Sequence, residues 1–172
     1  MVTGDDGPHG DRDDVADPHA ELPVDPDADA LRPRPLHWRP TALLWVFCGG
    51  VLGTALRFAG ETLVPHEGAG WPWATFMINL SGAFILGALL EGLARWGGDN
   101  GWRQRVRLFA GTGFCGAFTT YSTLALEASL LGKGGQIAMA VGYGLGSVVA
   151  GLVVAWLGIV SAAEVHRRRM RS

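Results

Sequence analysis

Apolar residues dominate four stretches of the chain, and short polar connections separate them. The stretches cover residues 41–63, 72–95, 106–131 and 137–163. Because about 20 apolar residues carry a helix across the core of a bilayer, each stretch is long enough to span a membrane. Buried helices of a water-soluble bundle fit poorly, since segments that are apolar on all sides leave little polar surface for water. The pattern predicts an all-α membrane protein with four transmembrane helices in one small domain, residues 41–163.

The third stretch contains an unusual central segment. Residues 113–123 read Gly-Phe-Cys-Gly-Ala-Phe-Thr-Thr-Tyr-Ser-Thr, which places glycines and hydroxyl groups in the middle of a span. A helix break at this depth frees backbone polar groups, and these are tolerated only inside protein or beside a watery path. We therefore predict that this segment is a functional site.

The first 40 residues differ in composition from the rest of the chain. Residues 1–30 hold ten acidic residues, one basic residue (Arg12) and no aromatic residue. Such a segment buries too little apolar surface to offset its ordering entropy, so we predict a disordered acidic tail over residues 1–40, which serves as a spacer rather than a docking motif. The tail lacks the pattern of a cleaved signal peptide, so the first span should be retained. Residues 164–172 are predicted to form a short basic C-terminal tail.

The distribution of basic residues predicts the orientation in the membrane. Almost all basic residues of the spans and their connections lie on the same side as the two termini. On the other side the chain has only Lys133, with Arg57 near the end of the first span as the other candidate. By the positive-inside rule, both termini of this multi-pass protein of the cell membrane are predicted to be cytoplasmic. Eleven arginines share the side of the termini, namely Arg32, Arg34, Arg39, Arg95, Arg103, Arg105, Arg107, Arg167, Arg168, Arg169 and Arg171.

Small residues recur at spacings of about four in three of the spans, which indicates close packing of helix backbones. Both cysteines, Cys48 and Cys115, lie within spans, so we interpret them as small packing residues rather than a disulfide. The small residues are Gly49, Gly53 and Gly60 in the first span, Gly82, Ala83 and Gly87 in the second, and Gly142, Gly146, Ser147, Ala150 and Gly151 in the fourth.

The few polar residues within the spans are mostly neutral hydrogen-bond donors. Each has a structural alternative, because an amide can bond between helices and a hydroxyl can bond to its own helix. Their clustering favours a polar track, and neutral donors suit a small hydrated anion better than a cation. Glu127 ends the polar run and Glu91 ends the second span, so both are placed near an interface. The track consists of Asn79, Thr119, Thr120, Ser122, Thr123, Tyr143 and Ser147.

Residues 42–163 resemble the Fluc (CrcB) family of fluoride channels. The resemblance is carried by three motifs, of which the third is the most specific. They are Gly49-Gly50-x-x-Gly53-x-x-x-Arg57, Thr75-x-x-x-Asn79-x-x-Gly82-x-Phe84-x-x-Gly87 and Gly113-Phe114-Cys115-Gly116-x-x-Thr119-Thr120-x-Ser122-Thr123-x-x-x-Glu127.

The resemblance implies an antiparallel dimer with two fluoride pores and a third helix broken at mid-membrane. It also implies a structural sodium ion at the dimer centre, held by the backbone carbonyls of Gly116 and Thr119. Arg57 and Glu127 are further motif positions. The implied pore residues are Asn79, Thr120, Tyr121, Ser122, Thr123, Tyr143 and Ser147.

Two positions depart from the family pattern. The family usually has phenylalanine where this chain has Tyr121 and Leu124, and leucine has no electropositive ring edge to offer an anion. The chain could therefore act with a homologous partner of opposite topology, or as a supporting subunit that does not conduct.

Other classes of function fit the sequence less well. A small four-helix multidrug exporter needs a membrane-embedded carboxylate, and the first span offers only Glu61, at its outer end. No nucleophile, base and orienting group converge, so we do not predict an enzyme. There is no Walker-type glycine loop for ATP. The prediction is passive export of cytoplasmic fluoride, which confers fluoride resistance.

Overall fold

The computed structural model describes residues 39–65, 70–97 and 100–171, and in these ranges the regular structure is entirely helical. The predicted acidic tail lies outside the described residues, apart from its last two positions. The helical elements are α2 (Pro40–Leu63), α3 (Trp73–Arg95), α4 (Gly101–Val106), η2 (Arg107–Cys115), α5 (Gly116–Phe118), α6 (Tyr121–Lys133) and α7 (Ile137–Arg169).

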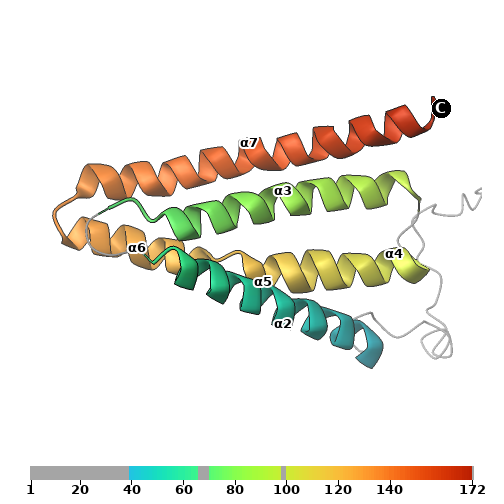
Figure 1. Cartoon of the computed structure of the whole chain (residues 1–172), viewed down its shortest axis with the longest axis horizontal. Coiled ribbons are helices and arrows are strands. Elements are labelled where there is room, and N and C mark those ends of the chain that lie inside the picture. The colour runs from blue at the N-terminus through green and yellow to red at the C-terminus, as the bar shows by residue number, and fades with distance from the viewer. Residues whose placement is uncertain (1–38, 66–69, 98–99, 172) are drawn as a thin grey trace, which may run out of the picture. The chain divides into compact units, whose positions relative to one another are not determined.

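The helices lie roughly along one long axis and alternate in direction (Figure 1). α3 and α7 run the same way and pack along their length, while α2 packs against η2 and α6 against α7. Three helices, α2, α3 and α7, are long and apolar enough to cross a membrane. α7 continues to Arg169, six residues past the predicted end of the fourth span.

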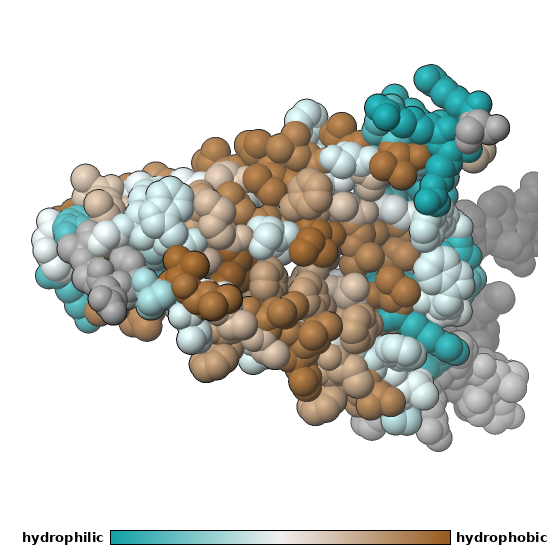
Figure 2. Space-filling model, in the orientation of Figure 1, coloured by the Kyte–Doolittle hydropathy of each residue, from teal (hydrophilic) through white to brown (hydrophobic). Residues whose placement is uncertain are grey.

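The distribution of side chains is inverted relative to a water-soluble protein. Large apolar residues cover the outside, as Phe58 at 69% and Leu152 at 68% exposure illustrate, whereas Thr75, Thr120 and Ser147 are buried. Figure 2 shows hydrophobic side chains across the middle of this face, with hydrophilic ones concentrated at the end where α7 terminates. Because lipid solvates apolar side chains, this arrangement indicates a multi-pass membrane protein with a polar interior.

The segment predicted as the third span is not one continuous helix. The short helix α4 precedes it and shares only Val106 with it. The segment then continues as the π-helix η2, a rare form that often occurs at functional sites. Helical structure ends at Phe118, and Thr119 and Thr120 are both extended, with ψ of 156° and 119°. α6 then begins at Tyr121. The two extended residues lie within residues 113–123, the segment that the sequence predicts to be a functional site.

Glycines bring helix backbones into direct contact at two interfaces. A Cβ added to Gly49 would overlap the carbonyl oxygen of Phe109, and one added to Gly53 would overlap that of Phe114, so α2 lies directly on η2. Gly87 and Gly158 form the equivalent contact between α3 and α7. The predicted packing role of Gly142 and Gly151 is not seen within this subunit, since both face open space and the close contact of α7 occurs at Gly158 instead.

The contact at Gly49 leads to a prediction on stability. Gly49→Ala would place a methyl group on a backbone carbonyl that cannot move aside, so we expect it to destabilise the protein by about 2 kcal/mol or more. Gly92→Ala is the matched control, because its added Cβ meets nothing within 4 Å. Thermal unfolding in detergent would measure both variants. Equal midpoints for the two would contradict the packing described here.

Candidate ion pathway

The side chain of Asn79, on α3, holds the backbone of the helix break. Its Nδ2 donates to the carbonyl oxygen of Thr120 at 3.0 Å, and its Oδ1 accepts from the Thr120 N–H at 2.8 Å. These are the two backbone groups that a continuous helix would have paired internally. One amide therefore satisfies both in a region where unpaired backbone groups are costly.

The hydroxyl of Thr120 organises the start of α6. It accepts a hydrogen bond from the Thr123 N–H at 3.1 Å, which is the usual role of an N-cap threonine. It also lies 3.0 Å from the Thr123 hydroxyl, to which it donates, and 3.2 Å from the Ser122 hydroxyl. The structure thus brings two of the predicted pore hydroxyls, those of Ser122 and Thr123, to the buried hydroxyl of Thr120.

A second polar cluster joins α3, α6 and α7. The Thr75 hydroxyl donates to Glu127 Oε1 at 2.8 Å, and the Tyr143 phenol donates to Glu127 Oε2 at 2.6 Å. Thr75 is 1% exposed and Tyr143 is fully buried, so both hydroxyl groups are held inside the subunit. The edge of the Trp71 ring contacts Tyr143, with centroids 5.4 Å apart.

The two clusters lie at successive levels along α3 and α7, and their residues are together called the polar path. Thr75 and Asn79 are one turn apart on α3, and Tyr143 and Ser147 are one turn apart on the parallel helix α7, a step of about 6 Å on each helix. Glu127 bonds to both Thr75 and Tyr143, so these two residues lie at the same level of the subunit. Because α3 and α7 run in the same direction, Asn79 and Ser147 both lie one turn further toward the C-terminal ends of these helices. Ser147 is buried and its hydroxyl has no hydrogen-bond partner among the described residues. A buried hydroxyl of this kind is available to water or an ion.

Other predicted site residues lie around the break. Tyr121 is 83% exposed and points away from the body of the subunit, and Ser122 and Gly116 are also exposed. The Thr119 hydroxyl donates to the Cys115 carbonyl at 2.9 Å, and its methyl group occupies the space that a side chain at Gly82 would need. Phe118 stacks on Phe114, with centroids 5.4 Å apart.

The remaining predictions concern charged and sulfur-containing residues. Arg57, near the end of α2, is half-buried and forms no ion pair or hydrogen bond with the described residues. Glu91 is paired with Arg95 one turn along α3, which fits the interfacial position predicted for it. Cys48 and Cys115 are free thiols. Cys115 is buried where η2 ends, as the packing interpretation requires, but Cys48 is exposed and has no packing role within this subunit.

The chemistry of the two clusters follows from the side chains that form them. The two clusters consist of hydroxyl and amide groups around one carboxylate, and most of the hydroxyl protons are engaged within the clusters. The Ser147 hydroxyl has no hydrogen-bond partner among the described residues. The one carboxylate on the path has both oxygens engaged by hydroxyl donors.

Comparison with known proteins decides the family. Residues 44–159 match the family model described as CrcB-like protein, Camphor Resistance (CrcB). The chain belongs to the CrcB family. The match begins four residues into α2 and ends within α7, so it covers every residue of the polar path.

Curated members of the CrcB family support this assignment over nearly their whole length. The chain is 44% identical over 140 residues to "Fluoride-specific ion channel FluC 1" of Cutibacterium acnes, which covers 81% of this chain and 98% of that one. It is 41% identical over 135 residues to "Fluoride-specific ion channel FluC 2" of Leifsonia xyli, covering 78% and 92%. A Thermus thermophilus "Fluoride-specific ion channel FluC" is 40% identical over 116 residues, covering 67% and 90%.

Sequence reasoning missed part of the site. It named Thr75 only as a motif residue and placed Glu127 near an interface, whereas the structure joins both to Tyr143 in one buried cluster. The signal was the spacing, because Thr75 lies four residues before Asn79, as Tyr143 does before Ser147. Trp71 carried no such signal, and its ring nitrogen is buried without a hydrogen-bond partner among the described residues.

Proposed function

We propose that this chain is a subunit of a passive, fluoride-selective channel that exports cytoplasmic fluoride and confers fluoride resistance. The single observation that supports this most directly is the buried path of neutral donors in a chain of the CrcB family, whose relatives are named fluoride-specific ion channels. Those relatives are named as channels and not as enzymes.

The proposed path runs past the two polar clusters. Fluoride would pass along Tyr143 and Ser147 on α7 and along Asn79 on α3, with the hydroxyls of Thr120, Ser122 and Thr123 beside the break. Such donors replace the hydration shell of a small anion without binding it too tightly to leave. In this proposal Tyr121 serves a partner chain, because it points outward from its own subunit.

Export along this path would need no driving force other than the membrane potential. Fluoride enters a cell as neutral HF and becomes an anion at cytoplasmic pH. A membrane potential of about 100 mV contributes about 2.3 kcal/mol per charge. At about 1.4 kcal/mol per tenfold, this would hold the fluoride concentration inside the cell roughly fifty-fold below that outside at equilibrium.

The helix break supports dimerisation as part of the proposal. Gly116, Tyr121 and Ser122 flank the extended pair and are exposed, whereas Thr119 is half-buried and Thr120 is buried. Irregular backbone at membrane depth is tolerated only where it is covered by protein or lies beside a watery path. A second subunit would cover this region. We propose that α4, η2, α5 and α6 together make one broken span, so that the subunit has four spans, and that two subunits pair antiparallel. The arginine distribution favours cytoplasmic termini.

The break also fits the sodium ion that the family resemblance implies. The carbonyl oxygens of Gly116 and Thr119 accept no hydrogen bond from the described residues, because α5 ends two residues later and the chain is then extended. Uncommitted carbonyl oxygens are suitable ligands for an alkali cation. Paired with the same residues of a second subunit, they would hold a structural sodium ion.

A supporting role without conduction is the second candidate. The observation in its favour is that Tyr121 and Leu124 stand where the family usually has phenylalanine. A small multidrug exporter is disfavoured, because the embedded carboxylate of Glu127 is engaged by two hydroxyl donors within a chain of the CrcB family.

Liposome efflux tests the proposed function. We expect the purified protein, alone or with its partner subunit, to release fluoride from loaded liposomes and to retain chloride. Protein-free liposomes provide the background rate, and a fluoride electrode and a chloride electrode read both ions from one preparation. Equal efflux of the two ions would contradict a fluoride-selective channel.

A further inference from the structure

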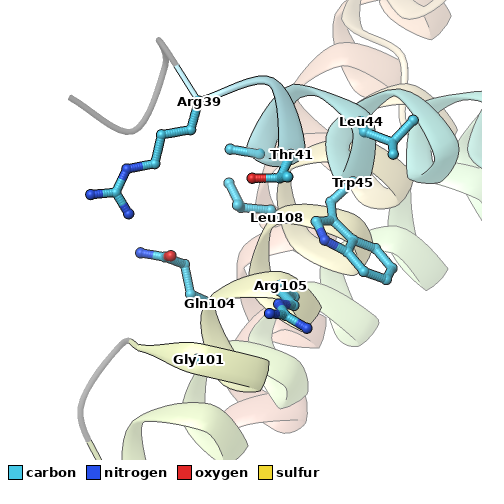
Figure 3. A pocket seen from close by; sticks show the side chains of 9 residues that line it. Arg39, Thr41, Leu44, Trp45, Gly101, Gln104, Arg105 and Leu108 are labelled. Atoms are coloured by element: carbon cyan, nitrogen blue, oxygen red, sulfur yellow. The ribbon is translucent and has the colours of Figure 1, made fainter. Parts of the chain in front are cut away.

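A cavity of about 550 Å³ lies between the first turns of α2 and the α4–η2 segment, remote from the polar path. Figure 3 shows its arrangement: the side chains of Arg39 and Gln104 approach each other from opposite sides, and the Thr41 hydroxyl faces the gap between the two helices. The guanidinium group of Arg105 lies beneath the Trp45 indole. The other lining residues are Ala42, Leu44, Gly101 and Leu108.

The lining has a polar, cationic part and an apolar part. Arg39 and Arg105 provide two positive charges, Gln104 and Thr41 provide neutral donors, and none of the nine lining residues is acidic. Arg105 forms no ion pair or hydrogen bond with the described residues. Two guanidinium groups with uncharged donors beside them match the oxygens of a phosphate group.

The apolar part indicates that the phosphate is attached to a lipid. Leu44 is 60% exposed and Trp45 is 39% exposed, on the side of the cavity that leads along α2 toward the apolar middle of the molecule. Ala42 and Leu108 are buried and line the cavity floor. Tryptophan prefers the level of the lipid headgroups, where its ring is apolar and its N–H is solvated. A soluble anion would gain nothing from these residues.

We propose that this cavity binds the headgroup of an anionic phospholipid, with its phosphate between Arg39 and Arg105 and its acyl chains along Leu44 and Trp45. The cavity opens at the arginine-rich end of the subunit, which is the side predicted to face the cytoplasm. The cytoplasmic leaflet is the one that carries anionic lipid, and basic pockets beside transmembrane helices on that side bind such headgroups. The bound lipid would anchor the start of α2 against the α4–η2 segment.

Native mass spectrometry of the full-length protein tests this proposal. The protein is mixed with equal amounts of phosphatidylglycerol and phosphatidylcholine, and the lipids that remain bound are counted. We expect wild type to retain phosphatidylglycerol preferentially. Arg39→Gln with Arg105→Gln should lower this preference by about fivefold for each guanidinium group removed. The matched control is Arg168→Gln with Arg171→Gln, which removes the same charge at the same end but outside the cavity, and should behave as wild type.

Three outcomes would overturn the proposal. The first is an unchanged preference in the Arg39/Arg105 variant, and the second is an equal loss in the Arg168/Arg171 control, which would show attraction by net charge alone. The third is displacement of phosphatidylglycerol by inorganic phosphate at equal concentration, which would identify a site for a soluble anion. The test reads lipid retention and not fluoride efflux, so its result does not depend on the proposed function.

Discussion

Replacement of Asn79 by aspartate is expected to lower fluoride efflux by at least about a hundredfold while the protein remains folded. A carboxylate has no donor and carries a negative charge on the path of an anion. At about 4 Å and an effective dielectric constant of about 20, two like charges repel by about 4 kcal/mol, which is enough for a loss of this size. The Thr120 N–H still finds an acceptor in the new side chain, so the break keeps one of its two hydrogen bonds to α3.

The control for this experiment is Ser81→Ala on the same helix. The Ser81 hydroxyl bonds only to the carbonyls of Met77 and Ile78, within α3, so its removal should leave efflux unchanged. Gel filtration and the thermal midpoint show whether each variant is folded. Wild-type efflux from a folded Asn79→Asp protein would mean that Asn79 only supports the break and does not contact the ion.

Expression of this chain without any homologue is expected to give no fluoride resistance. Eleven arginines on one side against one or two basic residues on the other should insert every copy in a single orientation. An antiparallel pair then needs a homologous subunit that inserts the other way. Such a subunit would supply the aromatic contacts that Tyr121 and Leu124 do not reproduce, and the outward position of Tyr121 leaves room for a specialised partner.

Labelling of single cysteines in the terminal tails of intact cells tests the orientation. The expected result is that an impermeant reagent reaches neither terminus, because both are cytoplasmic. Resistance should appear only when the homologue of opposite charge bias is expressed as well. If the chain alone inserts both ways and confers resistance, it is a dual-topology homodimer and the proposal of a partner is wrong.

The sequence predicts the helical, membrane-embedded character of the fold because that character depends on long apolar runs. It also singles out residues 113–123, where glycine and hydroxyl residues interrupt the run and where the structure places the extended Thr119 and Thr120. It does not predict η2, because the wider helical bonding of Arg107–Cys115 arises alongside α2, whose glycines lie against it. The role of Gly158 was missed for a related reason, since only the packed structure shows which face of α7 meets α3.

The candidate site shows the same division between local and tertiary information. The sequence shows the type of each residue, so Asn79, Tyr143 and Ser147 could be selected as the rare polar residues of apolar helices. The sequence does not show their hydrogen-bond partners, because a pair such as Asn79 and Thr120 is 41 residues apart and meets only in the folded structure. Glu127 was interpreted from its neighbours along the chain, but its position is determined by hydroxyl groups on two other helices.

The bond between Asn79 and Thr120 has a consequence for biosynthesis. The Asn79 side chain, which pairs with the backbone of the break, lies on α3. Because α3 precedes the break in the sequence, Asn79 is synthesised before Thr120 leaves the ribosome. The segment can therefore enter the bilayer next to a helix that already offers a substitute for its missing backbone pairing. An isolated peptide of residues 101–133 would lack this template, and its lowest-energy state in lipid would be an uninterrupted helix.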